Sequence, residues 1–75
     1  MTEEQIWQTI GLDLKRAANY LISGLPLKAK YFLDEAESLL PKIIPQKYKK
    51  ALQFWNKNNP EDLLLTSTLL THVRE

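Results

Sequence analysis

The segment YLISGLPLKAKYFLDEAESLLP, Tyr20 to Pro41, decides the fold. Gly24 favours the left-handed backbone conformation that ends many helices, and Pro26 suits the first turn of a new helix. Pro41 then ends that second helix, because proline has no backbone N–H to continue the hydrogen-bond ladder. The segment therefore predicts two antiparallel helices that are joined by a sharp corner.

The helix before the corner is expected over residues 3–23. It begins with a capping box, in which Thr2 caps the helix and Gln5 reaches back to the cap. With the ideal step of about 100° per residue, the apolar side chains fall on one side; they are Ile6, Trp7, Ile10, Leu14, Ala17, Ala18, Leu21 and Ile22. Leu12 points nearly opposite to this core face, among polar neighbours.

The helix after the corner is expected over residues 26–40. Its core face is predicted to hold Leu25, Ala29, Phe32, Leu33, Ala36, Leu39 and Leu40. Leu27 and Tyr31 lie one turn apart on the other side, where an isolated helix would be polar. These two residues are therefore candidates for contact with a partner.

Two further helices are expected over residues 45–57 and 60–73. Asn59 can cap the last one, and Pro60 suits its first turn. The run LLLTSTLLT also fits a strand, but the cap favours a helix. Its predicted core face holds Leu63, Leu65, Leu69, Leu70 and Val73, and its nearly uncharged outer face holds Leu64, Ser67, Thr68 and Thr71. The chain thus reads as an all-α, compact four-helix bundle with a single domain over residues 1–75.

Composition narrows the class of protein. A chain of 75 residues buries only about 60% of the surface that its unfolded form exposes, so its core is marginal and self-association would supplement it. The chain has no cysteine and carries a net charge of +1. Its start is acidic and no apolar run approaches the roughly 20 residues of a membrane span. We therefore expect a cytoplasmic protein without a membrane partner.

The hairpin resembles part of a tetratricopeptide repeat over residues 13–41. The matching positions are Ala17, Tyr20, Gly24, Ala29, Leu33, Ala36 and Pro41, whereas Asp13 and Arg16 stand where the family pattern has Trp and Leu. The resemblance implies two antiparallel helices that approach closely at small residues. A repeat protein usually needs at least about three repeats for stability, so we favour a compact bundle with a repeat-like hairpin.

The stretch DLKRAANYLISGLPLKAKYFLDEAESLL, residues 13–40, also resembles the core hairpin of the HEPN family. That family comprises nucleotide- and RNA-associated four-helix bundles, and here Ala36 and Glu37 match its alanine-rich helix. Members with RNase activity carry an arginine a few residues before a histidine. In this chain Arg74 follows His72 instead, so the resemblance does not imply nuclease activity.

The sequence contains no signature of catalysis, of a metal site or of a cofactor site. His72 is the only histidine, and Glu35 and Glu37 are two residues apart, so they do not face each other on a helix. No Ser–His–acid set or glycine-rich phosphate loop is present. We therefore expect a protein that is not an enzyme and that needs no cofactor.

Two surfaces remain as candidate sites. Off-core apolar residues predict a protein partner or a homo-oligomer, and they are Leu12, Leu27, Tyr31 and Leu64. The alternative is nucleic-acid binding by a basic face around an aromatic ring, formed by Lys47, Lys49, Lys50, Phe54 and Lys57. The same lysines also fit an ordinary solvated helix face. The primary prediction is a small interaction or adaptor module that associates with itself.

Overall fold

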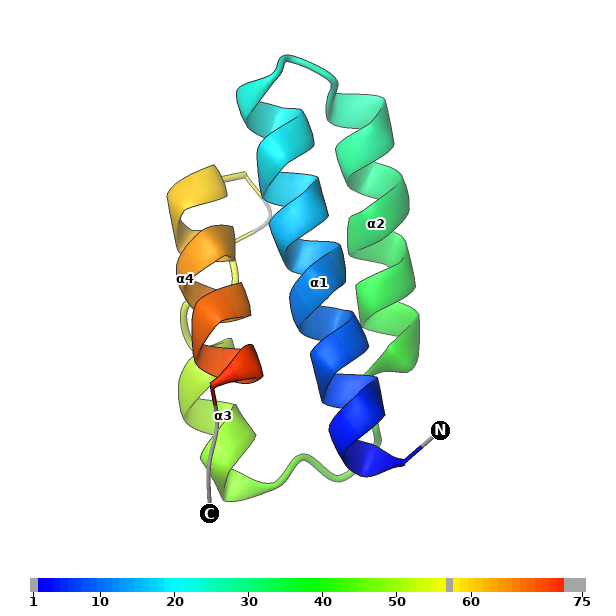
Figure 1. The fold of residues 1–75 in the computed structure, drawn as a ribbon, viewed down its shortest axis with the longest axis vertical. Coiled ribbons are helices and arrows are strands. Elements are labelled where there is room, and N and C mark those ends of the chain that lie inside the picture. Colours follow the sequence, from blue (N-terminus) through cyan, green and yellow to red (C-terminus); the bar gives the residue numbers. More distant parts are fainter. Residues whose placement is uncertain (1, 57, 73–75) are drawn as a thin grey trace.

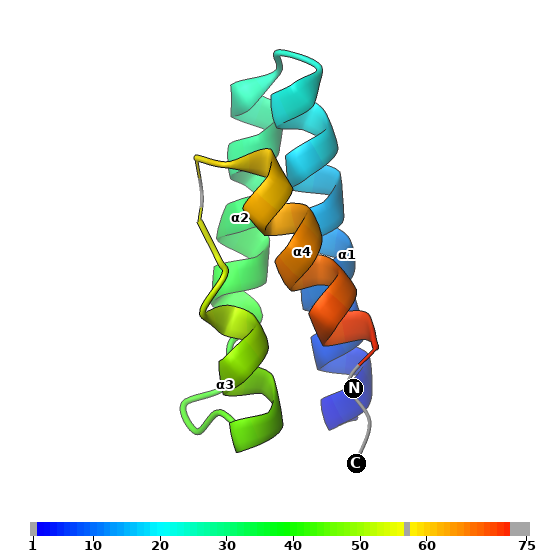
Figure 2. The ribbon, with the colours of Figure 1, turned by 90° about the vertical axis from the view of Figure 1, so that its left-hand side faces the viewer.

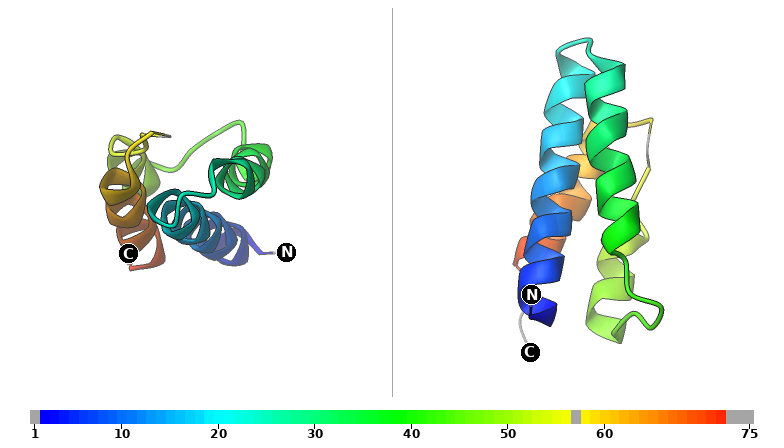
Figure 3. Two further views of the ribbon diagram at one scale, coloured as in Figure 1. Left: turned by 90° about the horizontal axis from the view of Figure 1, so that it is seen from above. Right: turned by 90° about the vertical axis from the view of Figure 1, so that its right-hand side faces the viewer.

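The chain folds around one long helix. The structure, a computed structural model, describes residues 2–56 and 58–72. None of these residues lies in a β-strand, and most belong to the helices α1 (Glu3–Ile22), α2 (Pro26–Leu39), α3 (Gln46–Leu52) and α4 (Pro60–Thr71). The predicted all-α class is therefore confirmed. α1 occupies the middle, with α2 on one side and α3 and α4 on the other (Figures 1 and 3).

The predicted caps fix where the long helices begin. Thr2 Oγ1 accepts a hydrogen bond from the Gln5 backbone N–H at 3.2 Å, and the Gln5 side chain accepts one from the Thr2 N–H at 2.9 Å. The Asn59 side chain accepts from the N–H groups of Glu61 and Asp62. Each cap satisfies backbone donors that have no partner within the helix, so both helices start where the sequence indicates.

The corner between α1 and α2 is a glycine-dependent helix end. Gly24 has a φ of +76°, which a side chain would strain. The Leu25 N–H donates to the Tyr20 carbonyl at 2.8 Å and the Gly24 N–H donates to the Leu21 carbonyl at 3.1 Å. These bonds close the last turn of α1 and reverse the chain. α2 then returns antiparallel to α1, as predicted (Figure 1).

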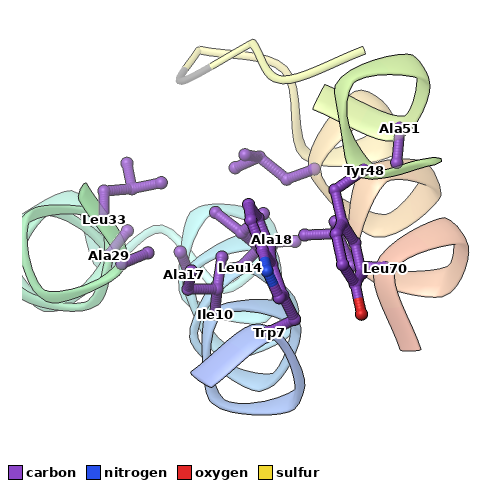
Figure 4. Close-up of a cluster of buried hydrophobic side chains, with 12 residues drawn as sticks. Trp7, Ile10, Leu14, Ala17, Ala18, Ala29, Leu33, Tyr48, Ala51 and Leu70 are labelled. Atoms are coloured by element: carbon purple, nitrogen blue, oxygen red, sulfur yellow. The ribbon is translucent and has the colours of Figure 1, made fainter. Parts of the chain in front are cut away.

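Small side chains allow α1 and α2 to pack closely. Ala17 of α1 and Ala29 and Ala36 of α2 are completely buried. Ala17, Ala29 and Leu33 lie between the two ribbons in Figure 4. Because alanine adds little beyond the backbone, the helices gain dispersion contacts along their length without a thick layer of large side chains.

α4 packs against α1 with a face that combines predicted core residues with Ser67, which was expected to point outward. Ser67 is buried, and its hydroxyl donates a 2.6 Å hydrogen bond to the Gly11 carbonyl. A Cβ placed on Gly11 would lie 2.7 Å from Thr71 Cγ2, so the two helices meet closely only because Gly11 has no side chain. Leu63 and Leu70 are buried and Thr68 is exposed, as predicted, so the predicted phase of this helix is right in part. Leu65, expected in the core, is exposed, and Leu64, expected outside, is half-buried against the core.

α3 is shorter than predicted and is attached to α1 by an aromatic stack. It ends at Leu52 instead of near residue 57. The Phe54 and Trp55 N–H groups donate to carbonyls three residues back, and the Asn56 side chain accepts from the Asn58 N–H, so the chain continues as tight turns. These turns return Trp55 to the edge of the core.

The contact between α3 and α1 is the stack of Tyr48 on Trp7. Their ring centroids are 4.2 Å apart and the rings are nearly parallel (Figure 4). Both residues are buried, and the Trp7 Nε1 atom has no hydrogen-bond partner among the described residues. α3 lies beside α4 at the lower end of the bundle (Figure 2), and Tyr48 reaches from it to Trp7 of α1.

The other predicted boundaries agree to within one or two residues. α1 ends at Ile22, α2 at Leu39 and α4 at Thr71. Lys57 and Val73 lie outside the described residues. Within the described part of the chain, no helix is long and apolar enough to cross a membrane.

Candidate functional site

The outward face of α2 presents large apolar side chains to solvent. Leu27 is 84% exposed and Tyr31 is 64% exposed, one turn apart, as their predicted position on the outer side required. Ile22 and Leu25 are exposed as well, although the sequence predicted both in the core. They lie at the hairpin corner, where the C-terminal end of α1 extends beyond α4 (Figure 1), so no other helix covers them.

An aromatic cluster holds Tyr31 in place. Its ring meets the edge of Phe32 with centroids 5.2 Å apart, and Phe32 stacks on Tyr20 of α1 at 5.6 Å. The guanidinium group of Arg16 lies 5.7 Å from the centroid of the Phe32 ring, and the Lys28 ammonium group lies 5.7 Å from that of Tyr20. These cation–π contacts and stacks fix the side chains along one seam of α1 and α2.

The two remaining predicted partner-binding residues lie elsewhere. Leu12 is 47% exposed in the middle of α1, next to Gly11, where α4 packs. Leu64 packs against the core from α4. Leu12 and Leu64 therefore lie on different helices from Leu27 and Tyr31. The four predicted residues do not form a single surface on one helix.

The seam of α1 and α2 also contains a buried carboxyl group that sequence reasoning missed. Asp13 is 1% exposed. Burial and the repulsion of Glu35 on α2, with a side-chain hydrogen bond to Glu35, raise the pKa of Asp13 from 3.8 to about 6, against the opposing effect of Arg16. Asp13 Oδ2 has no hydrogen-bond partner within the described residues.

The lysines of the alternative site lie on α3. Lys49 and Lys50 are exposed, and the Lys47 ammonium group lies 5.3 Å from the centroid of the Tyr48 ring. Phe54 is 44% exposed in the turn that follows α3. Lys57, the fifth predicted residue, is outside the described part of the chain.

A groove joins three of these residues to α4. It has a volume of about 650 Å³ and is lined by Gln46, Lys47, Lys50, Ala51, Phe54, Leu69 and His72. The lining thus combines two cations with apolar groups from Ala51, Phe54 and Leu69. Sequence reasoning placed Lys47, Lys50 and Phe54 on one face, but it missed Leu69 and His72 because they come from the other helix.

The described residues contain no group of three or more His, Cys, Asp or Glu side chains that could hold a metal ion. The two surfaces with candidate chemistry are therefore the α2 face, built around Leu27 and Tyr31, and the α3–α4 groove. One is apolar with charged flanks, and the other is cationic with an aromatic ring.

Comparisons with known proteins add no relative to this description. No protein-family model, no curated protein and no solved structure matches the chain. The resemblances to the tetratricopeptide repeat and to the HEPN family therefore stay predictions.

Proposed function

We propose that this protein is a small, non-catalytic helical interaction module of the cytoplasm that associates with itself through the exposed face of α2. The observation that carries the proposal is the exposure of Leu27 and Tyr31 on one face of a helix whose charges are divided between its ends. Burying a leucine side chain contributes roughly 1.5–3 kcal/mol, which is a large amount for a domain of this size.

The charges on α2 suit an antiparallel pair of identical helices. Lys28 and Lys30 lie in its N-terminal half, and Asp34, Glu35 and Glu37 lie in its C-terminal half. With about 100° per residue, Lys28 and Glu35 flank one edge of the Leu27–Tyr31 face, and Lys30 and Glu37 flank the other. Asp34 lies on this second edge too, and it pairs with Lys30 within the same helix. A two-fold axis across α2 therefore sets each lysine opposite a carboxylate of the second copy. Parallel helices would instead set like charges together.

The side chain of Tyr31 on this face is already held in position before any partner binds. Tyr31 already packs on Phe32, so binding would cost little additional side-chain entropy. Stable interfaces usually bury about 800 Å² on each partner, and the whole chain exposes 5156 Å². Ile22 and Leu25 at the hairpin corner extend the apolar area beyond α2.

The test is the molar mass in solution, measured by light scattering on a sizing column from micromolar to millimolar concentration. We expect a mass that rises toward that of a dimer. Leu27→Asp with Tyr31→Asp should give a monomer at every concentration. Leu12→Asp, an equally polar change at an exposed leucine of α1, is the control and should leave the mass of the wild type unchanged.

Charge reversal tests the antiparallel arrangement. Lys30→Glu should weaken association because it sets two carboxylates against each other, and adding Glu37→Lys should restore it. A wild-type protein that stays monomeric at millimolar concentration would overturn self-association. A double reversal that fails to restore the dimer would overturn the antiparallel geometry.

A further inference from the structure

We propose that the groove between α3 and α4 binds single-stranded nucleic acid, with one base against the Phe54 ring and the neighbouring phosphates at Lys47 and Lys50. This site is separate from the α2 face, so the inference does not depend on self-association. It rests on three features of the groove: the charge of its lining, the apolar surface inside it and its size.

The charge of the lining selects an anion. Among the described residues that line the groove, two are lysines and none is acidic. α3 contributes Lys49 as a third cation in a helix of seven residues that contains no acid. The acids of α4, Glu61 and Asp62, are in its first turn, whereas the groove residues Leu69 and His72 are at its C-terminal end. Lys47 and Lys50 therefore attract a phosphate to a part of the groove whose described lining carries positive charge.

The apolar part of the groove selects a flat, uncharged group next to that anion. Phe54 is 44% exposed, and Ala51 and Leu69 are the other apolar residues of the lining. An unpaired base offers such a flat face, and bases stack on aromatic side chains in proteins that bind single strands. A paired base in a duplex keeps its faces covered by its neighbours. The groove therefore fits a single strand rather than a double helix.

The size of the groove limits the occupant to a few groups. A volume of about 650 Å³ is within the range of small-molecule sites, which hold a base with its sugar and phosphate. It is too small to enclose a partner helix with its side chains, whose diameter is about 10–12 Å. The side chains of Gln46 and His72 supply hydrogen-bonding groups at the same groove for the polar edge of a base.

The experiment measures fluorescence anisotropy of a labelled oligothymidine with the full-length protein. We expect saturable binding that falls by about sevenfold between about 50 mM and about 200 mM salt, as release of counterions from two phosphates requires. The same strand paired with its complement should bind at least tenfold more weakly, since its bases cannot reach Phe54.

Matched variants separate charge from stacking. Lys50→Glu should weaken binding by about tenfold or more and flatten the salt dependence, because a phosphate contact becomes a repulsion. Lys15→Glu, at an exposed lysine of α1 with the same change in net charge, should have less than a threefold effect. Phe54→Leu keeps an apolar side chain but removes the ring, and it should weaken binding by about fivefold or more without changing the salt dependence.

Several results would overturn the proposal. The proposal would be wrong if the oligothymidine does not bind at low salt, or if Lys15→Glu and Lys50→Glu reduce its affinity equally. It would also be wrong if Phe54→Leu binds the strand as tightly as the wild type. Competition by free thymidine monophosphate as strong as that of the oligonucleotide would assign the groove to a free nucleotide instead. Competition by an oligoglutamate of the same length would assign it to an acidic peptide.

Discussion

Helix α1 is held to its neighbours in two different ways. Toward α2 and α4, small residues bring the helices close along most of their length, and the side chains of Thr2 and Asn59 cap the starts of α1 and α4. Toward α3, the contact centres on the stack of Tyr48 and Trp7, and α3 has seven residues and no side-chain cap. α2 and α4 thus pack on α1 along much of their length, whereas α3 is held to α1 by one aromatic stack and otherwise packs on α4.

The largest effect is expected when that aromatic contact is removed. Tyr48→Ala should lower the free energy of unfolding by about 3–4 kcal/mol, through lost burial and the cavity left beside Trp7. Amide hydrogen exchange should accelerate most in α3. Tyr31→Ala removes the same atoms from an exposed site, and at concentrations where the protein is monomeric it should cost only about 1 kcal/mol, through the lost edge contact with Phe32. An equal loss of protection from amide exchange in α1 and α3 would show instead that these two helices unfold as one unit.

A second prediction concerns Asp13, the buried carboxyl group between α1 and α2. The native state holds the proton of Asp13 up to a pKa of about 6 and the unfolded chain releases it near 3.8, so this group lowers stability as pH rises through that interval. Asp13→Asn removes the charge and should raise stability by about 3 kcal/mol at pH 8, with almost no effect near pH 4.

Thermal unfolding of both proteins across this pH range gives the comparison. Glu35 from α2 and Arg16 from α1 are the charged groups that face Asp13. Asp34→Asn serves as the control, because Asp34 is exposed and pairs with Lys30 on the surface. A gain from Asp13→Asn that does not depend on pH would contradict the burial of a charge at this site.

The smallest effect tests how closely α1 and α4 meet. Gly11→Ala gains about 1 kcal/mol of helix propensity but sets a methyl group against Thr71 Cγ2. When Thr71 is present, we expect the gain in helix propensity and the cost of this contact to cancel, so that Gly11→Ala leaves the free energy of unfolding nearly unchanged. In a Thr71→Ser background the methyl group of Thr71 is absent and the hydroxyl remains, so Gly11→Ala should stabilise by about 1 kcal/mol. Chemical denaturation of the four proteins measures this coupling, and additive effects would argue against the contact.

The sequence predicted the features that local chemistry decides. The capping box at Thr2, the glycine corner at Gly24 and the cap at Asn59 depend on residues a few positions apart, and all three are confirmed. The predicted length of α3 was wrong. After Leu52 the chain forms tight turns that bring Trp55 to the core, and the stabilisation from burying Trp55 depends on tertiary packing that local sequence does not encode.

The orientation of α4 and the lining of the groove depend on distant residues. Hydrophobicity alone favours Leu65 over Ser67 for the core. Ser67 is buried because Gly11, on another helix, leaves space for it and accepts its hydrogen bond. The sequence assigned no role to His72, and only the neighbouring α3 makes it part of a groove. The burial of Asp13 likewise follows from the approach of α2.

The hydrogen bond between Ser67 and Gly11 joins positions that are 56 residues apart in the chain. During synthesis, α1 and α2 can form their hairpin early because their contacts are local. The other flank of α1 has to wait, with apolar side chains uncovered, until α4 has left the ribosome. Contacts over long stretches of chain slow folding and leave intermediates that aggregate. A nascent chain stalled before α4 should therefore be a substrate for chaperones.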